Sequence, residues 1–252
     1  MVADLLPPVL AAGSAVLIFA LGIALVALHT VLFASASRRT ALEPRKQIAA
    51  TVFAGALLAI WLAVGVVIAD RSHFQLVSSG VRLPVVLLVG FGPVAVLIAL
   101  LFTSKTVGEI NRAMPPDWLI WAQTYRIAGW MFLYPFLYYG VIPAGFAVPA
   151  ALDDFFTGAV APLVALRVTR RRQFGWAIAW NIFGLLDLIA APVAALLSGA
   201  KIIDLYPLVL VPLFIGPPLG ILTHVYSLRN LAVAMRQINR QSRQVMEATC
   251  QA

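Results

Sequence analysis

Residues 118–139 read WLIWAQTYRIAGWMFLYPFLYY, an apolar run that one charged residue, Arg126, interrupts near its middle. At about 1.5 Å per residue, a helix of this length crosses the ~30 Å hydrocarbon core of a membrane. No other basic residue lies inside an apolar run of this chain. A charge at that depth costs at least ~2.5–3.5 kcal/mol on insertion scales. Arg126 therefore marks a functional or structural polar site and needs a partner.

The composition of the whole chain is that of a membrane protein. Of its 252 residues, 62% are hydrophobic and 11% are charged, and the mean hydropathy is +0.95. A soluble domain has roughly 25% charged residues. The net charge of +8 does not indicate a nucleic-acid partner, because the basic residues lie between the apolar runs. With Cys250 as its single cysteine, the chain has no intrachain disulfide and no CxxC metal or redox site.

Seven apolar runs predict an all-α, polytopic membrane protein with seven transmembrane helices. The runs are 8–34, 47–69, 83–102, 118–139, 149–166, 174–197 and 206–228. We expect the first run to be retained as a helix, because no basic segment precedes it and it is too long for a signal peptide. Segment 140–148 is also apolar, and is either a tight turn or a re-entrant piece packed against protein.

The distribution of lysine and arginine predicts the orientation. Of the 18 basic residues, one is Arg126, and three (Arg71, Arg82 and Lys201) lie in the even-numbered loops. The other fourteen lie in the odd-numbered loops and the C-terminal tail. By the positive-inside rule the N-terminus is outside and the C-terminus is cytoplasmic, which indicates a multi-pass protein of the cell inner membrane.

We expect two parts, a seven-helix transmembrane domain at 1–230 and a cytoplasmic, basic, amphipathic tail at 231–252. Apolar and basic residues recur in the tail at helical spacing: Leu231, Met235 and Ile238, and Arg236, Arg240 and Arg243. Such a helix lies on anionic lipid at the cytoplasmic face. The alternative for the tail is a docking site for a cytoplasmic partner. For the chain as a whole, the expected protein partners are another membrane protein or a second copy of the chain.

The polar residues of the fourth run are predicted to share one face. Gln123, Arg126 and Trp130 are at positions i, i+3 and i+7 of an α-helix. The rise of the helix places Arg126 roughly 12 Å from the cytoplasmic end of the run, near the membrane midplane. This face is therefore expected to point toward a partner in another helix.

Asp187 in the sixth run is the expected counter-charge of Arg126. The two residues lie at similar depths, and Asp187 shares a helix face with Trp180, next to Asn181. Asp154, near the start of the fifth run, is the second candidate, unless it only caps its helix. The resulting ion pair either fixes the helix register or forms a site for a substrate, an ion or a proton, and both readings stay open.

Prolines and glycines interrupt the third and seventh runs near the midplane. They are Gly90, Gly92 and Pro93 in the third run, and Gly216, Pro217, Pro218 and Gly220 in the seventh. A Pro-Pro pair interrupts the helical hydrogen-bond ladder, and the carbonyls at such a break need other partners. Broken helices expose backbone to a solute in transporters, whereas the alternative here is a packing kink.

Two histidines admit a cofactor alternative. His29 and His224 each lie about five residues from the cytoplasmic end of a run, so they lie at similar depth. As neighbours they would be axial ligands of a b-type haem, since no CxxCH attachment motif exists. Otherwise they are interfacial histidines with ordinary hydrogen bonds, and no cofactor is predicted.

The leading functional hypothesis is a small-solute or proton-linked transporter, or a membrane-embedded binding protein. Its predicted substrate-binding residues are Arg126, Asp187, Asn181, Gln123, Asp154, Trp130 and Trp180, with Asp154 as an outer gate. The alternatives are a non-catalytic scaffold or accessory subunit of a membrane complex, and a b-haem redox protein. The chain has no GxGxxG, GxxxxGK[ST], HExxH or GxSxG motif. Enzymatic activity is therefore the weaker hypothesis, and no catalytic or metal-binding residue is predicted.

Overall fold

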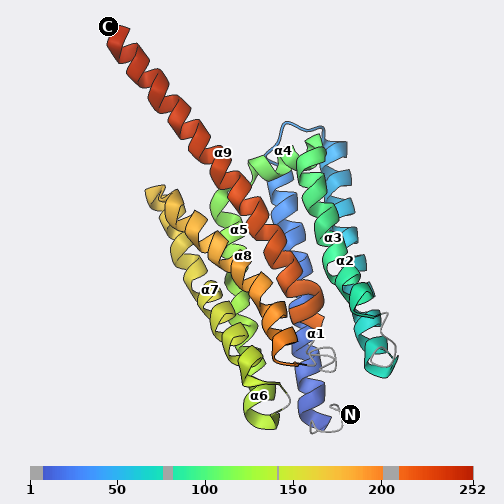
Figure 1. The fold of residues 1–252 in the computed structure, drawn as a ribbon. Helices are drawn as coiled ribbons and strands as arrows, with labels where there is room; N and C mark the ends of the chain where they lie inside the picture. The colour runs from blue at the N-terminus through green and yellow to red at the C-terminus, as the bar shows by residue number, and fades with distance from the viewer. Residues whose placement is uncertain (1–7, 76–81, 141, 201–209, 252) are drawn as a thin grey trace.

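The computed structural model describes residues 8–75, 82–140, 142–200 and 210–251, and it contains helices and no strand within these ranges (Figure 1). The N-terminal half holds α1 (Pro8–Ser37), α2 (Pro44–Gln75), α3 (Arg82–Thr103) and α4 (Lys105–Ala113). The middle holds α5 (Pro116–Ala122), the 3₁₀ helix η1 (Gln123–Phe132) and α6 (Leu133–Tyr139). They are followed by α7 (Ala144–Arg171), α8 (Phe174–Leu197), the π-helix η3 (Leu210–Ile215) and α9 (Gly216–Gln251). The all-α prediction is confirmed for these residues.

Four helices in the described part of the chain are long and apolar enough to cross a membrane: Val16–Ser37, Pro44–Ile68, Ala144–Arg171 and Phe174–Leu197. A fifth span results if Gly90–Thr103 and Lys105–Ala113, which meet at a bend of 90°, are taken together. The predicted fourth run is divided among α5, η1 and α6, and part of the seventh lies outside the described residues. The prediction of seven spans is therefore not confirmed.

Large apolar side chains cover the outside of these helices. Leu17 is 71% exposed, Phe53 is 59% exposed and Leu197 is 83% exposed. Water around such extensive apolar surface is unfavourable, whereas lipid chains are not. The structure is thus compatible with a membrane protein.

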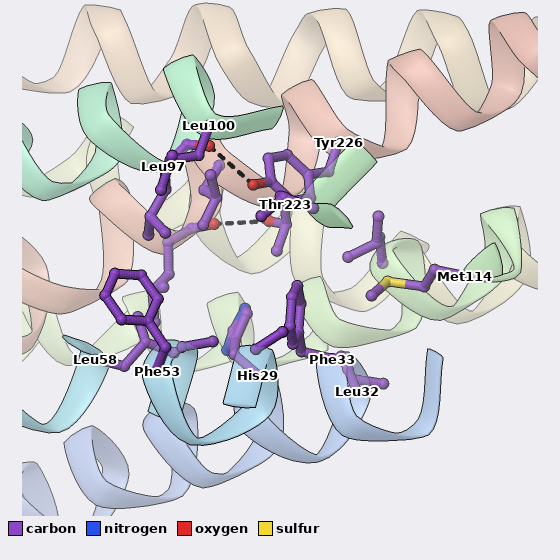
Figure 2. Close-up of a pocket in the computed structure, with 16 residues that line it drawn as sticks. His29, Leu32, Phe33, Phe53, Leu58, Leu97, Leu100, Met114, Thr223 and Tyr226 are labelled. Atoms are coloured by element: carbon purple, nitrogen blue, oxygen red, sulfur yellow. Dashed lines mark hydrogen bonds between the residues drawn. The ribbon is translucent and has the colours of Figure 1, made fainter. Parts of the chain in front are cut away.

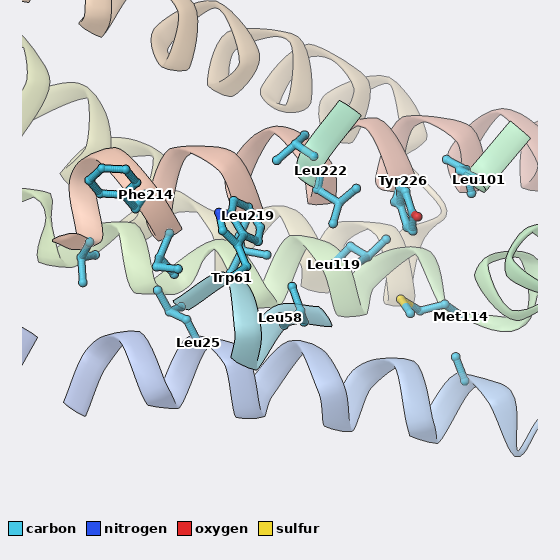
Figure 3. Close-up of a cluster of buried hydrophobic side chains, with 14 of the residues drawn as sticks. Leu25, Leu58, Trp61, Leu101, Met114, Leu119, Phe214, Leu219, Leu222 and Tyr226 are labelled. Atoms are coloured by element: carbon cyan, nitrogen blue, oxygen red, sulfur yellow. The ribbon is translucent and has the colours of Figure 1, made fainter. Parts of the chain in front are cut away.

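The largest buried apolar cluster joins α1, α2 and α3 to the start of α9 (Figure 3). Leu25 from α1 and Trp61 from α2 pack in it with Leu219 and Leu222 from α9. A second cluster joins α5, α7, α8 and α9, where small residues such as Ala165 let the helices approach closely. Helix α9 thus belongs to both halves of the bundle.

The C-terminal helix is longer than the predicted seventh run. α9 continues without a break to Gln251 and extends well beyond the other helices (Figure 1). This confirms that the tail continues helically. The helix is continuous across residue 230, and the division into domains 1–230 and 231–252 stays a prediction.

The predicted break in the seventh run is a π-helix just before Gly216. Pro217 and Pro218 then lie in the first turn of α9, directly after η3, and neither proline can donate a backbone hydrogen bond to the carbonyls of η3. The Tyr125 hydroxyl donates to the carbonyl of Gly216 at 2.5 Å, and the Gln123 amide donates to that of Gly220 at 3.1 Å. Side chains of the fourth run therefore bind the backbone beside the break.

The connection between α6 and α7 is short, because residues 144–148 already belong to α7. α6 ends at Tyr139, Gly140 has φ = 60°, and α7 begins at Ala144. A glycine adopts this left-handed conformation without steric cost. The described residues therefore favour the tight turn over the re-entrant piece, and residue 141 lies outside them.

Candidate functional site

Arg126 lies in the ten-residue 3₁₀ helix η1. A 3₁₀ helix has three residues per turn, so one face carries every third residue. The buried residues of η1 follow this spacing: Gln123, Arg126, Gly129 and Phe132. Trp130 is instead 57% exposed. The prediction that Trp130 shares the face of Arg126 is therefore wrong, because it assumed 3.6 residues per turn.

The guanidinium of Arg126 contacts two carboxylates from two different helices. Its Nε donates to Oδ1 of Asp154 on α7 at 2.6 Å, and its Nη2 donates to Oδ2 of Asp187 on α8. The Arg126 side chain is 1% exposed, that of Asp187 is 6% exposed and that of Asp154 is 22% exposed. The predicted pairing with Asp187 is present, and Asp154 is a second partner at the same time.

Asp154 does not cap its helix. α7 begins at Ala144, earlier than the predicted start at 149, so Asp154 lies well inside the helix. The capping alternative is therefore wrong. The carboxylate instead lies over Gly129 of η1, where a Cβ atom would overlap the Asp154 side chain.

The charges of this cluster do not balance. Arg126 carries one positive charge, and ionised Asp154 and Asp187 together carry two negative charges. In a medium of low dielectric constant, two carboxylates that share one site disfavour the state in which both are ionised. The cluster therefore favours an additional proton or a small cation.

His224 on α9 completes the surroundings of Arg126. Its Nε2 lies 3.3 Å from Nη1 of Arg126, and its Nδ1 lies 2.9 Å from Oδ1 of Asn181. Arginine only donates, so Nε2 accepts from Arg126 and the Nδ1–H donates to Asn181. The imidazole is thereby a neutral ring whose position depends on Asn181.

Asn181 and Trp180 hold this histidine. The amide nitrogen of Asn181 donates to the carbonyl of Ala177 at 2.7 Å and to Oγ of Ser227 at 3.2 Å. The Trp180 ring lies 5.1 Å from the His224 ring, and its indole N–H donates to the Thr157 carbonyl at 3.2 Å. Both residues, predicted as substrate ligands, therefore lie one contact away from the charged groups.

Replacing Asn181 with alanine is expected to destabilise the protein by about 1–3 kcal/mol, because it leaves the buried Nδ1–H of His224 without an acceptor. The free energy of unfolding in detergent micelles measures this loss. Asn239 lies on the exposed part of α9, so Asn239→Ala is the matched control, with a change within about 0.5 kcal/mol. Equal effects of the two changes would contradict the assigned role of Asn181.

Three glycines let the helices approach closely enough to form the cluster. A Cβ at Gly158 of α7 would overlap the backbone of Arg126 and Ile127, and one at Gly184 of α8 would overlap the His224 ring. Gly129 makes room for Asp154 in the same way. Small residues at such contacts are typical of membrane helices.

A cavity of about 30 Å³ adjoins the charged cluster, and its lining includes Arg126, Asp154, Tyr125 and Gly216. A water molecule needs about 10–15 Å³ in such a measure. The cavity therefore has room for water beside Arg126 and the Asp154 carboxylate, and not for a sugar or an amino acid.

Gln123 lies on the same face of η1 and binds a different part of α9. Its amide donates to Thr223 Oγ1 and to the carbonyl of Gly220. Of the seven predicted substrate-binding residues, Arg126, Asp154 and Asp187 are in direct contact. Asn181 and Trp180 support them through His224, Gln123 binds α9, and Trp130 faces outward.

The haem b alternative needs both histidines as iron ligands, and His224 does not fit it. Both ring nitrogens of His224 are engaged, by Asn181 and Arg126, so neither is free for iron. His29 donates from Nδ1 to the carbonyl of Leu25 at 2.7 Å. Within the described residues, no group of three or more His, Cys, Asp or Glu side chains is placed to hold a metal ion.

The sequence-based prediction missed His224 and Gly184 as members of the site. The sequence predicts His224 as a haem ligand or as an interfacial histidine, although it follows the Gly-Pro-rich break in the run that also carries Gly220. Gly184 lies between Asn181 and Asp187, one helical turn from each. Its position between two polar residues on one helix face could have predicted that Gly184 belongs to the site.

Comparison with known protein families identifies a family match. Residues 83–232 match the model of a domain of unknown function, DUF8737, and this segment contains the whole charged site. No curated protein and no solved structure matches the chain.

Proposed function

Because the chain belongs to the DUF8737 family, a family of unknown function, we propose its function from the charged site: a proton-linked transporter in which the charged cluster carries the proton. The observation that carries the proposal is one buried guanidinium between two carboxylates, beside a cavity of about 30 Å³. Ionisable groups inside a membrane are costly and typically form ion or proton pathways.

The proton is the ion that fits this site best. Protonation of one carboxylate leaves Arg126 with one anionic partner, so the cluster becomes neutral. Loss of the proton returns a net negative charge to a buried position. The neighbouring cavity admits water and no larger solute. The two carboxylates share the proton as a pair, so neither is assigned it alone.

The same arrangement provides a route from protonation to helix movement. Asp154 belongs to α7 and Asp187 to α8, and Arg126 holds both from η1. Neutralising one carboxylate weakens one of the two contacts and frees that helix relative to η1. A 3₁₀ segment inside a longer helix often marks a hinge. Asp154, the more exposed carboxylate, acts in this proposal as the outer gate.

The proposed topology has seven spans, with the N-terminus outside and the C-terminus in the cytoplasm of a cell with an inner membrane. The distribution of basic residues supports the orientation. In addition to the four long apolar helices and the bent pair Gly90–Thr103 and Lys105–Ala113, the segment α5–η1–α6 and the pair η3–α9 supply one span each. In this topology the basic tail 231–252 lies against anionic lipid.

The test uses Asp154→Asn and Asp187→Asn, each of which leaves Arg126 with one carboxylate. Because a balanced pair remains, both variants are expected to keep the wild-type unfolding free energy within about 1 kcal/mol. Infrared difference spectra between acidic and neutral buffer are expected to show a carboxylic acid band in the wild type and to lose it in both variants. A wild type without this band, or variants that keep it, would contradict the proton site.

Transport is tested in vesicles that contain the protein and a pH-sensitive dye. Under an imposed membrane potential, wild-type vesicles are expected to acidify faster than protein-free vesicles, and both variants are expected to lose the difference. Folded variants with the wild-type rate would show that the cluster only fixes the helices.

The second candidate function is a scaffold or accessory subunit, which the long projecting α9 favours (Figure 1). Arg236 and Arg240 are exposed on it, where they are available to a membrane-protein partner or a second copy. Purification in mild detergent distinguishes the two functions, since a stoichiometric partner that is lost when 231–252 is removed favours the scaffold.

A further inference from the structure

A second cavity, of about 100 Å³, lies among α1, α2, α3 and α9 (Figure 2). Its wall is almost entirely apolar and includes Phe33, Phe53 and Leu97. His29 of α1 contributes an imidazole to this wall and is 8% exposed. A buried polar ring in an apolar cavity calls for a hydrogen-bond partner.

The free nitrogen of His29 is an acceptor. Nδ1 lies 2.7 Å from the carbonyl of Leu25, and a carbonyl only accepts, so Nδ1 carries the hydrogen. Nε2 therefore presents a lone pair. This atom is buried and has no hydrogen-bond partner among the described residues.

The other polar groups of the cavity have already used their donors. The Tyr226 hydroxyl donates to the carbonyl of Leu97 at 3.0 Å, and the Thr223 hydroxyl donates to that of Leu219 at 2.8 Å. The described lining therefore offers acceptors to a ligand. A ligand that fits must be apolar over most of its surface and must carry a hydrogen-bond donor.

We propose that this cavity binds the hydroxyl end of a neutral, lipid-soluble alcohol, whose O–H donates to Nε2 of His29. The cavity is smaller than the ~150 Å³ cavity that is known to hold benzene, so an alkyl chain fits better than a ring. Because the cavity is partly open, the rest of the chain continues out of it. The site is independent of the proton-linked function of Arg126.

The experiment compares 1-hexanol with dipropyl ether, an isomer that accepts hydrogen bonds and does not donate them. The chain has three histidines, so the imidazole nitrogen spectrum of histidine-labelled protein is simple, and His29→Leu assigns the His29 signals. We expect 1-hexanol to shift the His29 Nε2 signal saturably, with a dissociation constant about fivefold or more below that of dipropyl ether.

The variant Ala54→Leu narrows the cavity and leaves His29 in place. It is expected to weaken the binding of both compounds. Equal dissociation constants for the two isomers in the wild type would show a purely apolar cavity and overturn the proposal, as would a 1-hexanol response that Ala54→Leu leaves unchanged. The comparison in the wild type stands even if a variant does not fold.

Discussion

Replacing Arg126 with alanine is expected to reduce the free energy of unfolding by about 3–5 kcal/mol, since removing one partner leaves two buried carboxylates without their counter-charge. Both carboxylates contact the guanidinium, and His224 and the Gly184 carbonyl accept from it as well. Chemical unfolding in detergent micelles, followed by the fluorescence of the six tryptophans, measures the loss.

The control removes all three charges together. In Arg126→Gln combined with Asp154→Asn and Asp187→Asn, no uncompensated charge remains, and most of the lost stability is expected to return. Arg126→Lys keeps the charge without the planar fork that reaches both carboxylates, and an intermediate loss is expected. A triple variant as unstable as Arg126→Ala would mean that packing, rather than charge, explains the effect.

The substitution Gly158→Leu is expected to have a comparable effect, with a loss of about 3 kcal/mol of unfolding free energy, at the upper end of the usual cost of overpacking. Even a Cβ atom at this position overlaps the backbone of Arg126 and Ile127, and a backbone moves less readily than a side chain. Overpacking of this kind typically costs about 1–3 kcal/mol for a few added methylene groups. The same variant is expected to move Asp154 away from Arg126, because both Asp154 and Gly158 lie on α7.

Gly175 is the matched control for Gly158. It also lies in a helix, α8, and a Cβ atom there meets no heavy atom within 4 Å. Gly175→Ala is expected to be neutral or to stabilise by up to about 1 kcal/mol, because alanine favours the helix. Unfolding measurements on Gly158→Ala, Gly158→Leu and Gly175→Ala form one series. A loss that did not grow from alanine to leucine at residue 158 would contradict the close contact with η1.

The pairing of Arg126 with Asp187 could be anticipated because it depends on depth alone. Each residue lies in an apolar run, and the rise per residue fixes how far it lies from the end of that run. The second bond to Asp154 was harder to foresee. The predicted start of its helix at 149 placed the residue in the first turn, whereas the helix begins at Ala144.

The outward position of Trp130 could not be obtained from the sequence in the same way. Nothing in residues 123–132 distinguishes a 3₁₀ helix from an α-helix, because both suit the same residue types. The difference of a fraction of a residue per turn accumulates, so the face that carries Arg126 continues at Gly129 rather than Trp130. This winding accompanies the contact between η1 and α7 at Gly158.

The cavity beside His29 also could not be predicted from the sequence. The first three runs carry few polar residues, and His29 was considered only with His224. Its free Nε2 indicates a binding site because the side chains of α2, α3 and α9 that line the same cavity offer it no donor. An acceptor without a donor results from how several helices pack together, so the sequence of a single helix does not reveal it.

The sequence by itself determined the all-helical class, the apolar exterior and the need of Arg126 for an acidic partner. These depend on composition, run length and the cost of a charge in an apolar medium, which are properties of single segments. Only the tertiary structure decided that two carboxylates share one guanidinium, that His224 accepts from it, and that Trp130 lies outside. These depend on how α7, α8, η1 and α9 approach one another, and that approach is set by small residues whose effect exists only at a contact between helices.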